Sequence, residues 1–263
     1  MQNTTQQLSG KIAIVTGAAS GVGAGIARRF AAEGARVMLH DVDAAVRETA
    51  AAIRDAGGDA DAVVSDLADP RVPAELIDAV AKRYGAIHIL VNNAALIVRA
   101  DAETTDVATW DRVMAVNVRA PFLLFKAALP YLRANGGGAV LNIGSMNAYC
   151  GQPNMMPYCV SKGALMTLTR NLADGHGRDN IRVNQLNLGW TITENEHRYK
   201  LAEGKPEDWA EHLPAEHAPL GRLMTPAEVA HFALSFVVDS ACMVSGSVTD
   251  LTQHPIIGRN PVK

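Results

Sequence analysis

Short runs of apolar and β-branched residues recur along the chain at regular intervals, and each has the length of one β-strand. Such runs, bounded by Gly, Asn, Asp and Pro, are typical of strands that are buried on both faces of a sheet. Seven strands are therefore predicted. They cover residues Lys11 to Thr16, Ala35 to His40, Ala60 to Val64, Ile87 to Val91, Ala139 to Gly144, Ile181 to Asn187 and Ser247 to Leu251.

Helical periodicity fills most of the intervals between these runs. Apolar residues recur at spacings of three and four, as in Ile26, Phe30 and Ala31, so one side of each segment can cover a sheet. Strands that alternate with helices indicate an α/β protein with a doubly wound parallel sheet. Because no repeat, low-complexity tract or linker interrupts the series, one domain over residues 1–263 is expected.

Two segments depart from this regular pattern. Residues Trp190 to Leu220 are polar, rich in His and Glu and poorly periodic, which is typical of a lid or insertion that shapes a binding site. The tail over residues 252–263 is too apolar and too rich in proline for a solvated end. It is therefore expected to pack against folded protein.

Composition narrows the possible partners and compartments. The 24 Lys and Arg against 27 Asp and Glu give a net charge of −3 without a basic block, so no nucleic acid partner is expected. Cys150, Cys159 and Cys242 form no paired motif, which favours a reducing, cytoplasmic location. No membrane association is expected, because the N-terminus lacks an apolar signal core and the uncharged stretch from Ala134 to Ser161 is rich in Gly and Asn.

A glycine-rich turn follows the first predicted strand. The sequence TGAASGVG, residues 16–23, leads directly into a helical pattern from Ala24. Glycines there let backbone N–H groups approach a pyrophosphate at the positive end of a helix. The order strand, turn, helix favours a dinucleotide site, and the alternative is a turn without a ligand.

The cofactor expected at this turn is NAD. Asp41 ends the second predicted strand, where an acidic side chain can accept hydrogen bonds from the adenosine ribose. The neighbours His40 and Val42 supply no arginine for the 2′-phosphate of NADP, and the carboxylate would repel that phosphate. The alternative is that Asp41 caps the following helix.

Tyr158 and Lys162 stand four residues apart in YCVSK, within a segment predicted to be helical from about Met155 to Asp174. That spacing places both side chains on one helical face. A tyrosine with an ordinary pKa of about 10 is a poor base at neutral pH, and a close ammonium group lowers that pKa by favouring the phenolate. Ser145 follows the fifth predicted strand at its carboxyl end, where α/β sheets bind ligands. Taken alone, the Tyr/Lys spacing is equally consistent with a chance helix face.

Together these motifs resemble those of the short-chain dehydrogenase/reductase family. TGAASGVG, Asn92 to Ala95, Asn117, Ser145 and YCVSK occur in the family's order over essentially the whole chain. The resemblance implies a Rossmann fold with strand order 3-2-1-4-5-6-7 and a homotetramer or homodimer. It also implies a catalytic group of Asn117, Ser145, Tyr158 and Lys162. In that group Asn117 kinks its helix and holds a water that links Lys162 to solvent, and the alternative is a polar helix residue without a role.

By position, the resemblance assigns further residues to the cofactor site. Gly17, Ser20, Val22 and Gly23 line the pyrophosphate turn, Asp41 holds the ribose, Asp66 and Leu67 flank the adenine, Asn93 and Ala94 line the cleft, Tyr158 and Lys162 hold the nicotinamide ribose, and Gly189, Thr191 and Thr193 belong to the loop at the carboxamide. The resemblance also suggests that the tail docks near the pocket of its own or a partner chain. The alternative is that the tail only seals a subunit interface.

Several positions depart from the family pattern. Ala95 replaces a glycine, Leu188 replaces a proline and Met224 replaces a common glycine. None of these changes removes a catalytic group, but they leave the path of the loop after Gly189 open. The usual glycine pair after the last strand is also absent, since Asp250 is followed by Leu251.

The expected reaction is NAD-dependent oxidation of a secondary alcohol by hydride transfer. Tyr158 removes the hydroxyl proton and Ser145 stabilises the developing carbonyl oxygen. Three amides near Tyr158 favour a sugar or polyol substrate, because an apolar ligand would leave them unpaired. They are Asn147, Gln152 and Asn154, and their alternative role is to cap the catalytic helix. His197 and Arg198, in the irregular segment, are candidate substrate contacts or solvated surface residues.

Other functions are weighed against this one. They are reduction of another carbonyl substrate, an enoyl-type reduction, and a catalytically inactive NAD-binding sensor or scaffold. Intact Ser145, Tyr158 and Lys162 argue against an inactive protein, and the family's enoyl reductases separate Tyr and Lys by more residues. No metal site is expected, because the eight His residues form no HExxH pattern.

Overall fold

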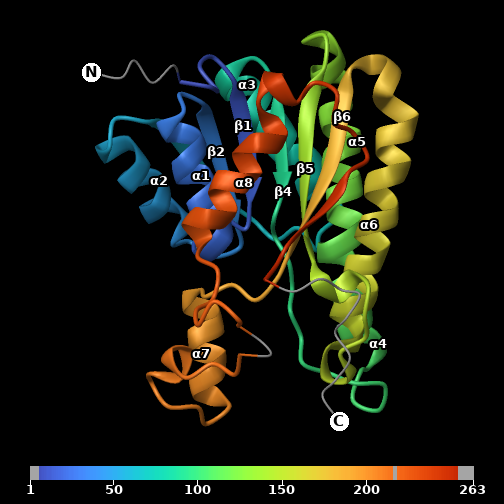
Figure 1. Ribbon diagram of the computed structural model, residues 1–263. Helices are drawn as coiled ribbons and strands as arrows, with labels where there is room; N and C mark the ends of the chain where they lie inside the picture. Colours follow the sequence, from blue (N-terminus) through green and yellow to red (C-terminus); the bar gives the residue numbers. More distant parts are fainter. Residues whose placement is uncertain (1–5, 216–217, 254–263) are drawn as a thin grey trace.

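The predicted sheet forms in the computed structural model, which describes residues 6–215 and 218–253. Seven parallel strands lie in the order β3-β2-β1-β4-β5-β6-β7 (Figure 1). This order confirms the predicted doubly wound α/β fold. The strands are β1 (Ile12–Thr16), β2 (Arg36–Asp41), β3 (Asp59–Val64), β4 (Ile89–Asn92), β5 (Gly138–Ser145), β6 (Ile181–Leu188) and β7 (Val248–Leu251).

Helices connect the strands and cover both faces of the sheet. The α-helices are α1 (Gly21–Ala32), α2 (Val46–Asp55), α3 (Val72–Tyr84), α4 (Val107–Met114), α5 (Ala120–Ala134), α6 (Met156–His176), α7 (Glu194–Ala202) and α8 (Pro226–Val237). A π-helical segment, η1 (Ala115–Arg119), joins α4 to α5. Short 3-10 turns are η2 (Met146–Ala148), η3 (Pro153–Met155), η4 (Gly177–Asp179), η5 (Trp209–Glu211) and η6 (Asp239–Ala241).

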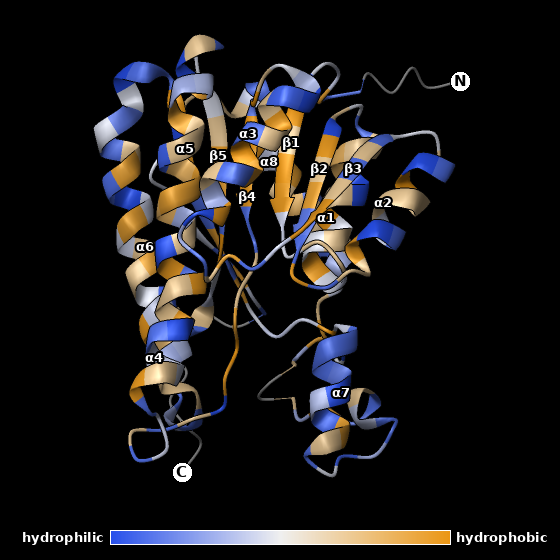
Figure 2. Ribbon diagram, turned by 180° about the vertical axis from the view of Figure 1, so that it is seen from behind, coloured by the Kyte–Doolittle hydropathy of each residue, from blue (hydrophilic) through white to orange (hydrophobic). Residues whose placement is uncertain are grey.

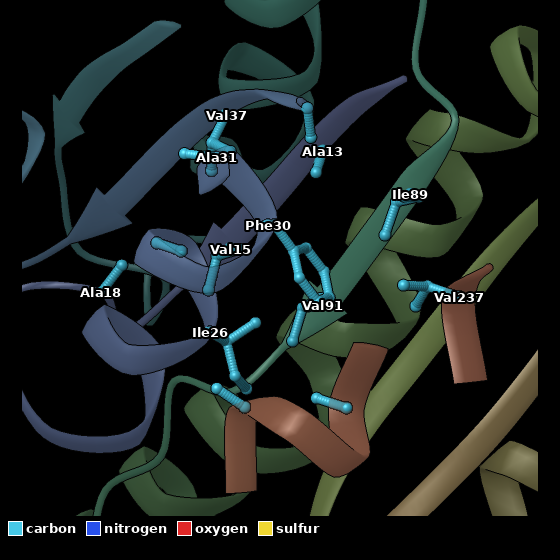
Figure 3. Close-up of a cluster of buried hydrophobic side chains, with 14 of the residues drawn as sticks. Ala13, Val15, Ala18, Ile26, Phe30, Ala31, Val37, Ile89, Val91 and Val237 are labelled. Carbon is cyan, nitrogen blue, oxygen red and sulfur yellow. The ribbon is translucent and has the colours of Figure 1, made fainter. Parts of the chain in front are cut away.

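Two hydrophobic clusters hold these layers together. One cluster packs α1, α2 and α8 on one face of the sheet, and the other packs α3, α5 and α6 on the opposite face. In the first cluster Phe30 of α1 is fully buried, and its ring points toward Val91 of β4 (Figure 3). Removal of such a ring typically costs about 3–5 kcal/mol, so this packing fixes the strand ends that carry the site.

One stretch, Val107–Ala134, is long and apolar enough by length and composition to cross a membrane. It comprises α4, η1 and α5, and its side chains Leu124, Phe125 and Leu132 are buried in the second hydrophobic cluster. Core helices of folded proteins pass the same test of hydropathy. Packing against the sheet therefore accounts for the apolar character of this stretch.

The poorly periodic segment after β6 contains a polar helix. No residue of α7 is buried, and most of the helix is hydrophilic (Figure 2), so no apolar stripe marks it in the sequence. The sequence signal for this helix is its N-terminal cap. The Thr193 side chain accepts a hydrogen bond from Glu196 N (3.1 Å) at the start of the helix. The remainder of the predicted C-terminal tail, residues 254–263, lies outside the described residues.

Candidate active site

The candidate residues gather at the carboxyl ends of the strands. Thr16, Asp41, Asn92 and Ser145 are the last residues of β1, β2, β4 and β5. Because all seven strands are parallel, these residues lie along one edge of the sheet (Figure 1). Open α/β sheets bind their ligands at this edge.

Steric crowding in the turn after β1 explains its glycines. Gly17 and Gly21 have φ angles of 66° and 54°, which favour glycine. A Cβ atom on Gly23 would lie 2.0 Å from Gly17 O, and one on Gly17 would lie 2.8 Å from Ala94 Cα. Ser20 precedes α1 and makes no side-chain capping bond within the described chain. The N–H groups of the first turn of α1 can therefore face a phosphate, so the residues present fit a dinucleotide.

Asn93, which follows the adjacent strand β4, supports the turn. Its side-chain Nδ2 donates to Thr16 O and Gly17 O, both at 2.9 Å. The Thr16 hydroxyl accepts from the backbone N of Asn93 and of Ala94, both at 3.1 Å. The Asn93 side chain thus fixes the backbone of the glycine turn, a contact that its place in the sequence did not predict.

Asp41 also contacts this turn. Its carboxylate accepts hydrogen bonds from Ala19 N (2.9 Å) and Asp43 N (3.0 Å). The following helix, α2, has Ala45 as its N-cap residue, so Asp41 is not its cap. The neighbouring Val42 is 64% exposed, which leaves the carboxylate beside an open surface where a ribose can bind.

Asp66 and Leu67, the residues expected at the adenine, both make contacts within the protein. The Asp66 carboxylate accepts from Ala68 N (2.9 Å) and pairs with Arg112 (2.8 Å), and the Ala68 N–H is the main cause of its lowered pKa. The Leu67 side chain is buried in the hydrophobic core. Any contact of Leu67 with a cofactor would therefore involve its backbone.

Tyr158 and Lys162 face the end of β5 from α6. The Lys162 ammonium donates to Ile143 O (2.7 Å) and lies 5.6 Å from the centre of the Tyr158 ring. Burial raises the pKa of Tyr158 to about 12, opposed in part by a hydrogen bond with the Ser145 side chain. Burial also lowers the pKa of Lys162 to about 8. The expected lowering of the Tyr158 pKa by Lys162 is not among the causes of its shift, and burial of the phenol, which disfavours the phenolate, sets the direction.

Asn117 lies in the π-helical segment η1 and is buried. Its Oδ1 accepts from Leu96 N (2.7 Å), and its Nδ2 donates to Leu96 O (3.0 Å) and Ser161 Oγ (2.9 Å). The Ser161 hydroxyl in turn donates to Tyr158 O (2.7 Å). Asn117 therefore joins the loop after β4 to α6, the helix that carries Tyr158 and Lys162, through Ser161.

The loop after Gly189 runs beside the glycine turn. A Cβ atom on Gly21 would lie 3.3 Å from the Thr193 methyl group. The Thr191 hydroxyl donates to Gly189 O (3.2 Å), and Thr191 pairs with Met224 in an isolated bridge. Leu188 continues the pairing of β6 opposite Ser145. Of the two residues that depart from the family pattern here, Leu188 thus lies within β6, and Met224 holds this loop through its bridge to Thr191.

The predicted substrate contacts are only partly brought together. Asn147 Nδ2 donates to Gln152 Oε1 (3.1 Å), and Asn147 N donates to Ser145 Oγ (3.2 Å). Asn154 is exposed on η3. His197 accepts a hydrogen bond from Trp209 Nε1 (3.0 Å) and pairs with Glu207 (3.1 Å), and Arg198 bonds to Asn195. His197 and Arg198, the two candidate substrate contacts in the irregular segment, therefore bond to other residues of that segment.

Sequence reasoning missed the contacts that build this segment. Trp190 and Trp209 stack with their ring centres 5.6 Å apart, and His197 stacks on Trp209 at 6.4 Å. Arg99, in the loop after β4, pairs with Glu203 at the end of α7 (2.8 Å). The only sequence signal was the unusual presence of two tryptophans in a polar stretch. Across residues 6–215 and 218–253, no group of three His, Cys, Asp or Glu could hold a metal ion.

Comparison with known proteins places this site in a family. A family model described as enoyl-(acyl carrier protein) reductase matches residues 17–251. Galactitol 2-dehydrogenase (L-tagatose-forming) of Cereibacter sphaeroides is 38% identical, over 93% of this chain and 94% of that protein. Cis-4-hydroxycyclohexanecarboxylate dehydrogenase of Sinomonas cyclohexanicum is 36% identical, over 90% of this chain and 93% of that protein.

A solved structure shares the fold as well as the sequence pattern. It is a putative NAD(P)-dependent gluconate 5-dehydrogenase from Beutenbergia cavernae with NADP bound at low occupancy. The two chains are 34% identical with a TM-score of 0.83, over 94% of this chain and 96% of that one. From the glycine turn to β7, sequence and architecture agree with these oxidoreductases. The chain therefore belongs to the short-chain dehydrogenase/reductase family, whose Rossmann fold binds a nicotinamide cofactor.

Proposed function

We propose that this protein oxidises a secondary hydroxyl group of a sugar or polyol with NAD, and that Tyr158 is the acid/base. The observation that carries the proposal is the placement of Ser145, Tyr158 and Lys162 around the end of β5. A bound nicotinamide supplies the hydride acceptor. Reduction of another carbonyl substrate uses the same groups in reverse.

Each residue of this group has a separate task. Tyr158 takes the substrate's hydroxyl proton, and the Ser145 hydroxyl donates to the oxygen as it becomes a carbonyl. Lys162 is close enough to favour the phenolate form of Tyr158 once the site is occupied. Asn117 acts as a positioning residue, because it reaches Tyr158 through Ser161. An inactive scaffold would have no use for this complete set.

Asp41 supports NAD rather than NADP. Its carboxylate closes the end of β2 beside the glycine turn, where it can accept from both ribose hydroxyls but repels a 2′-phosphate. The NADP found in the relative from Beutenbergia cavernae makes a direct test necessary. Asp41→Ala is expected to raise the NADP-to-NAD ratio of kcat/KM by about tenfold, the effect of losing a charge-assisted hydrogen bond. Asp43→Ala, which removes a neighbouring carboxylate that binds Ala45 N, is the matched control.

Two features support a polyhydroxylated substrate. Within the described chain, Asn147 Oδ1 and Gln152 Nε2 have no hydrogen-bond partner, although the two side chains bond to each other. They can therefore bind substrate hydroxyls, whereas burial against an apolar ligand would leave them unpaired at a cost of about 1–3 kcal/mol each. Relatives named for galactitol and gluconate are consistent with this class. The spacing of Tyr158 and Lys162 argues against an enoyl reduction.

A substrate screen tests the proposal. NADH and NADPH absorbance would be followed with polyols, aldoses, sugar acids, alicyclic hydroxy acids and steroid alcohols, each with NAD and with NADP. We expect the highest kcat/KM for a polyol or sugar with NAD. Turnover confined to apolar alcohols would contradict the substrate class, and a wild-type preference for NADP would contradict the assignment of Asp41.

A further inference from the structure

A continuous chain of buried polar side chains crosses the sheet beneath α6. The hydrogen bonds run from Asn92 Nδ2 to Asn142 Oδ1 (2.8 Å), Asn142 Nδ2 to Thr169 Oγ1 (2.8 Å), Thr169 Oγ1 to Gln185 Oε1 (3.0 Å), Gln185 Nε2 to Asn187 Oδ1 (2.7 Å) and Asn187 Nδ2 to Asp250 Oδ1 (3.0 Å). The first five side chains are buried, and Asp250 is exposed on the edge strand β7. Hydrogen bonds among buried groups are strong in the low-dielectric interior, and they fix the relative positions of the side chains that they join.

The carboxylate of Asp250 sets the orientation of the two nearest amides, those of Asn187 and Gln185. A carboxylate only accepts, so Asn187 must present its NH₂ group to Asp250 and its oxygen to Gln185. Gln185 must then donate through Nε2 to Asn187. At Thr169, which accepts from Asn142, the one hydroxyl proton lies within hydrogen-bond distance of both Gln185 Oε1 (3.0 Å) and Leu165 O (2.9 Å). At the far end Asn92 Oδ1 remains a buried acceptor without a partner in the described chain. The amide donors of Gln185 and Asn187 therefore point toward Asp250 on β7.

This chain touches the Ser145 turn before and after the serine. A Cβ atom on Gly144 would lie 2.1 Å from Asn187 Oδ1 and 2.4 Å from Gln185 Nε2, so the two amides pack directly on the backbone that precedes Ser145. After the turn, burial and then the nearby Asp250 carboxylate raise the pKa of Tyr149, so this carboxylate lies close to the Tyr149 hydroxyl. Tyr149 is the C-cap residue of η2, and Ser145 is its N-cap residue.

We propose that Asp250 is a positioning residue for Ser145, acting through Asn187 beneath the turn and through Tyr149 at its end. The inference rests on the proposed function for the role of Ser145 in the reaction. The turn fixes the hydroxyl, because Ser145 Oγ accepts from Asn147 N within it. A shift of Gly144 or Tyr149 would rotate the Ser145 hydroxyl away from Tyr158. Within the described chain, neither residue contacts the glycine turn after β1, so the proposed cofactor site would keep its geometry.

Asp250→Asn tests the inference with almost no change of shape. An amide can donate as well as accept, so Asn187 is no longer forced into one orientation under Gly144. We expect kcat to fall about tenfold, as small misplacements of catalytic groups do, while the dissociation constant of NAD stays within about twofold. Asp239→Asn, which removes a carboxylate paired with Lys11, should leave both values unchanged. Tyr149→Phe should lower kcat in the same direction if Asp250→Asn does not fold.

A double-mutant cycle separates positioning from general stability. In a Ser145→Ala background, Asp250→Asn should change the residual kcat by less than about twofold, because the hydroxyl it positions is gone. Amide hydrogen exchange in residues 146–150 should be faster in Asp250→Asn than in wild type, with exchange in α1 unchanged. Unchanged exchange in 146–150, or effects on kcat that multiply in the double variant, would overturn the inference. If wild type oxidises no secondary alcohol, the proposed function fails and the exchange result still decides whether Asp250 holds the turn.

Discussion

The glycine turn after β1 and the segment over residues 190–213 lie side by side at the site, yet different contacts hold them. The turn is built from backbone atoms in contact, with Gly23 against Gly17 O and Asn93 bonded to two carbonyls. The segment is built from side chains, namely the stacked rings of Trp190 and Trp209 and the ion pair of Arg99 with Glu203.

This difference separates the two tasks of the site. A turn without space for one methyl group tolerates almost no change, and it would hold the phosphates of the proposed cofactor in a single geometry. A segment held by rings and ion pairs at its surface can exchange one side chain for another and keep its backbone path. Cofactor binding is therefore expected to fail abruptly on substitution, whereas substrate affinity should change in steps.

The largest effect is expected from Gly23→Ala. The added methyl group would lie 2.0 Å from Gly17 O, so either the turn or the start of α1 must move. We expect NAD affinity, measured by NADH fluorescence titration, to fall about 100-fold or more, as misplacement by an ångström does. Gly175→Ala, in the exposed part of α6 with nothing within 4 Å, is the control and should bind NAD normally. Normal affinity in Gly23→Ala would show that the turn is not the phosphate site.

A smaller effect is expected from Trp209→Ala. Trp209 is buried in a separate cluster with Ala218 and Leu223, so its removal should loosen the segment while the two main cores keep the sheet folded. We expect substrate KM to rise about tenfold, a small part of the roughly 3–5 kcal/mol that a buried ring contributes, with NAD affinity changed far less. Trp209→Phe keeps a ring and should lie between. An unchanged KM in Trp209→Ala would exclude the segment from substrate binding.

The smallest effect is expected from the ion pair between Arg99 and Glu203. Its side chains are about one-third exposed, and such pairs contribute about 0.2–1 kcal/mol. Glu203→Gln should therefore raise substrate KM about twofold to fivefold and remove any salt dependence of KM. Glu211→Gln removes a carboxylate of the same segment that has no ion pair in the described chain, and should behave as wild type. If KM depends on salt equally in wild type, Glu203→Gln and Glu211→Gln, the ion pair has no role in substrate binding.

Much of this fold could be predicted because its signals are local. Seven apolar runs gave all seven strands within a few residues, and helical periodicity gave the layers around them. The glycine turn was predictable for the same reason, since the tightest contact of Gly23 is with Gly17 O in the same turn. Tyr158 and Lys162 needed only the repeat of one helix.

Other parts of the site depend on contacts between distant residues. Arg99 and Glu203 lie far apart in the sequence, and no periodicity pairs them. α7 has no buried face, so the hydrophobic pattern could not reveal it. The pKa of Tyr158 was predicted in the wrong direction for this state, because spacing indicates a nearby ammonium group but not how deeply both groups are buried.

The pH dependence of oxidation follows from these two pKa values. In the proposed reaction, the form that oxidises an alcohol has a Tyr158 phenolate beside a Lys162 ammonium. With pKa values of about 12 for Tyr158 and about 8 for Lys162, both groups are protonated below about pH 8, so the reactive form increases about tenfold per pH unit there. Above about pH 8 the main form has a neutral Tyr158 phenol and a neutral Lys162 amine. It carries the same number of protons as the reactive form, so the ratio of the two forms no longer depends on pH.

The most direct test of the account is the pH profile of kcat/KM for alcohol oxidation from about pH 6 to about pH 10. We expect a tenfold rise per unit that levels off near pH 8, and a rise that continues further in Lys162→Arg, because arginine stays charged. Tyr158→Phe should lower turnover about 10²–10⁴-fold and abolish the rise, with NAD still bound. A flat wild-type profile below pH 8, or a Tyr158→Phe variant with the wild-type profile, would contradict Tyr158 as the acid/base.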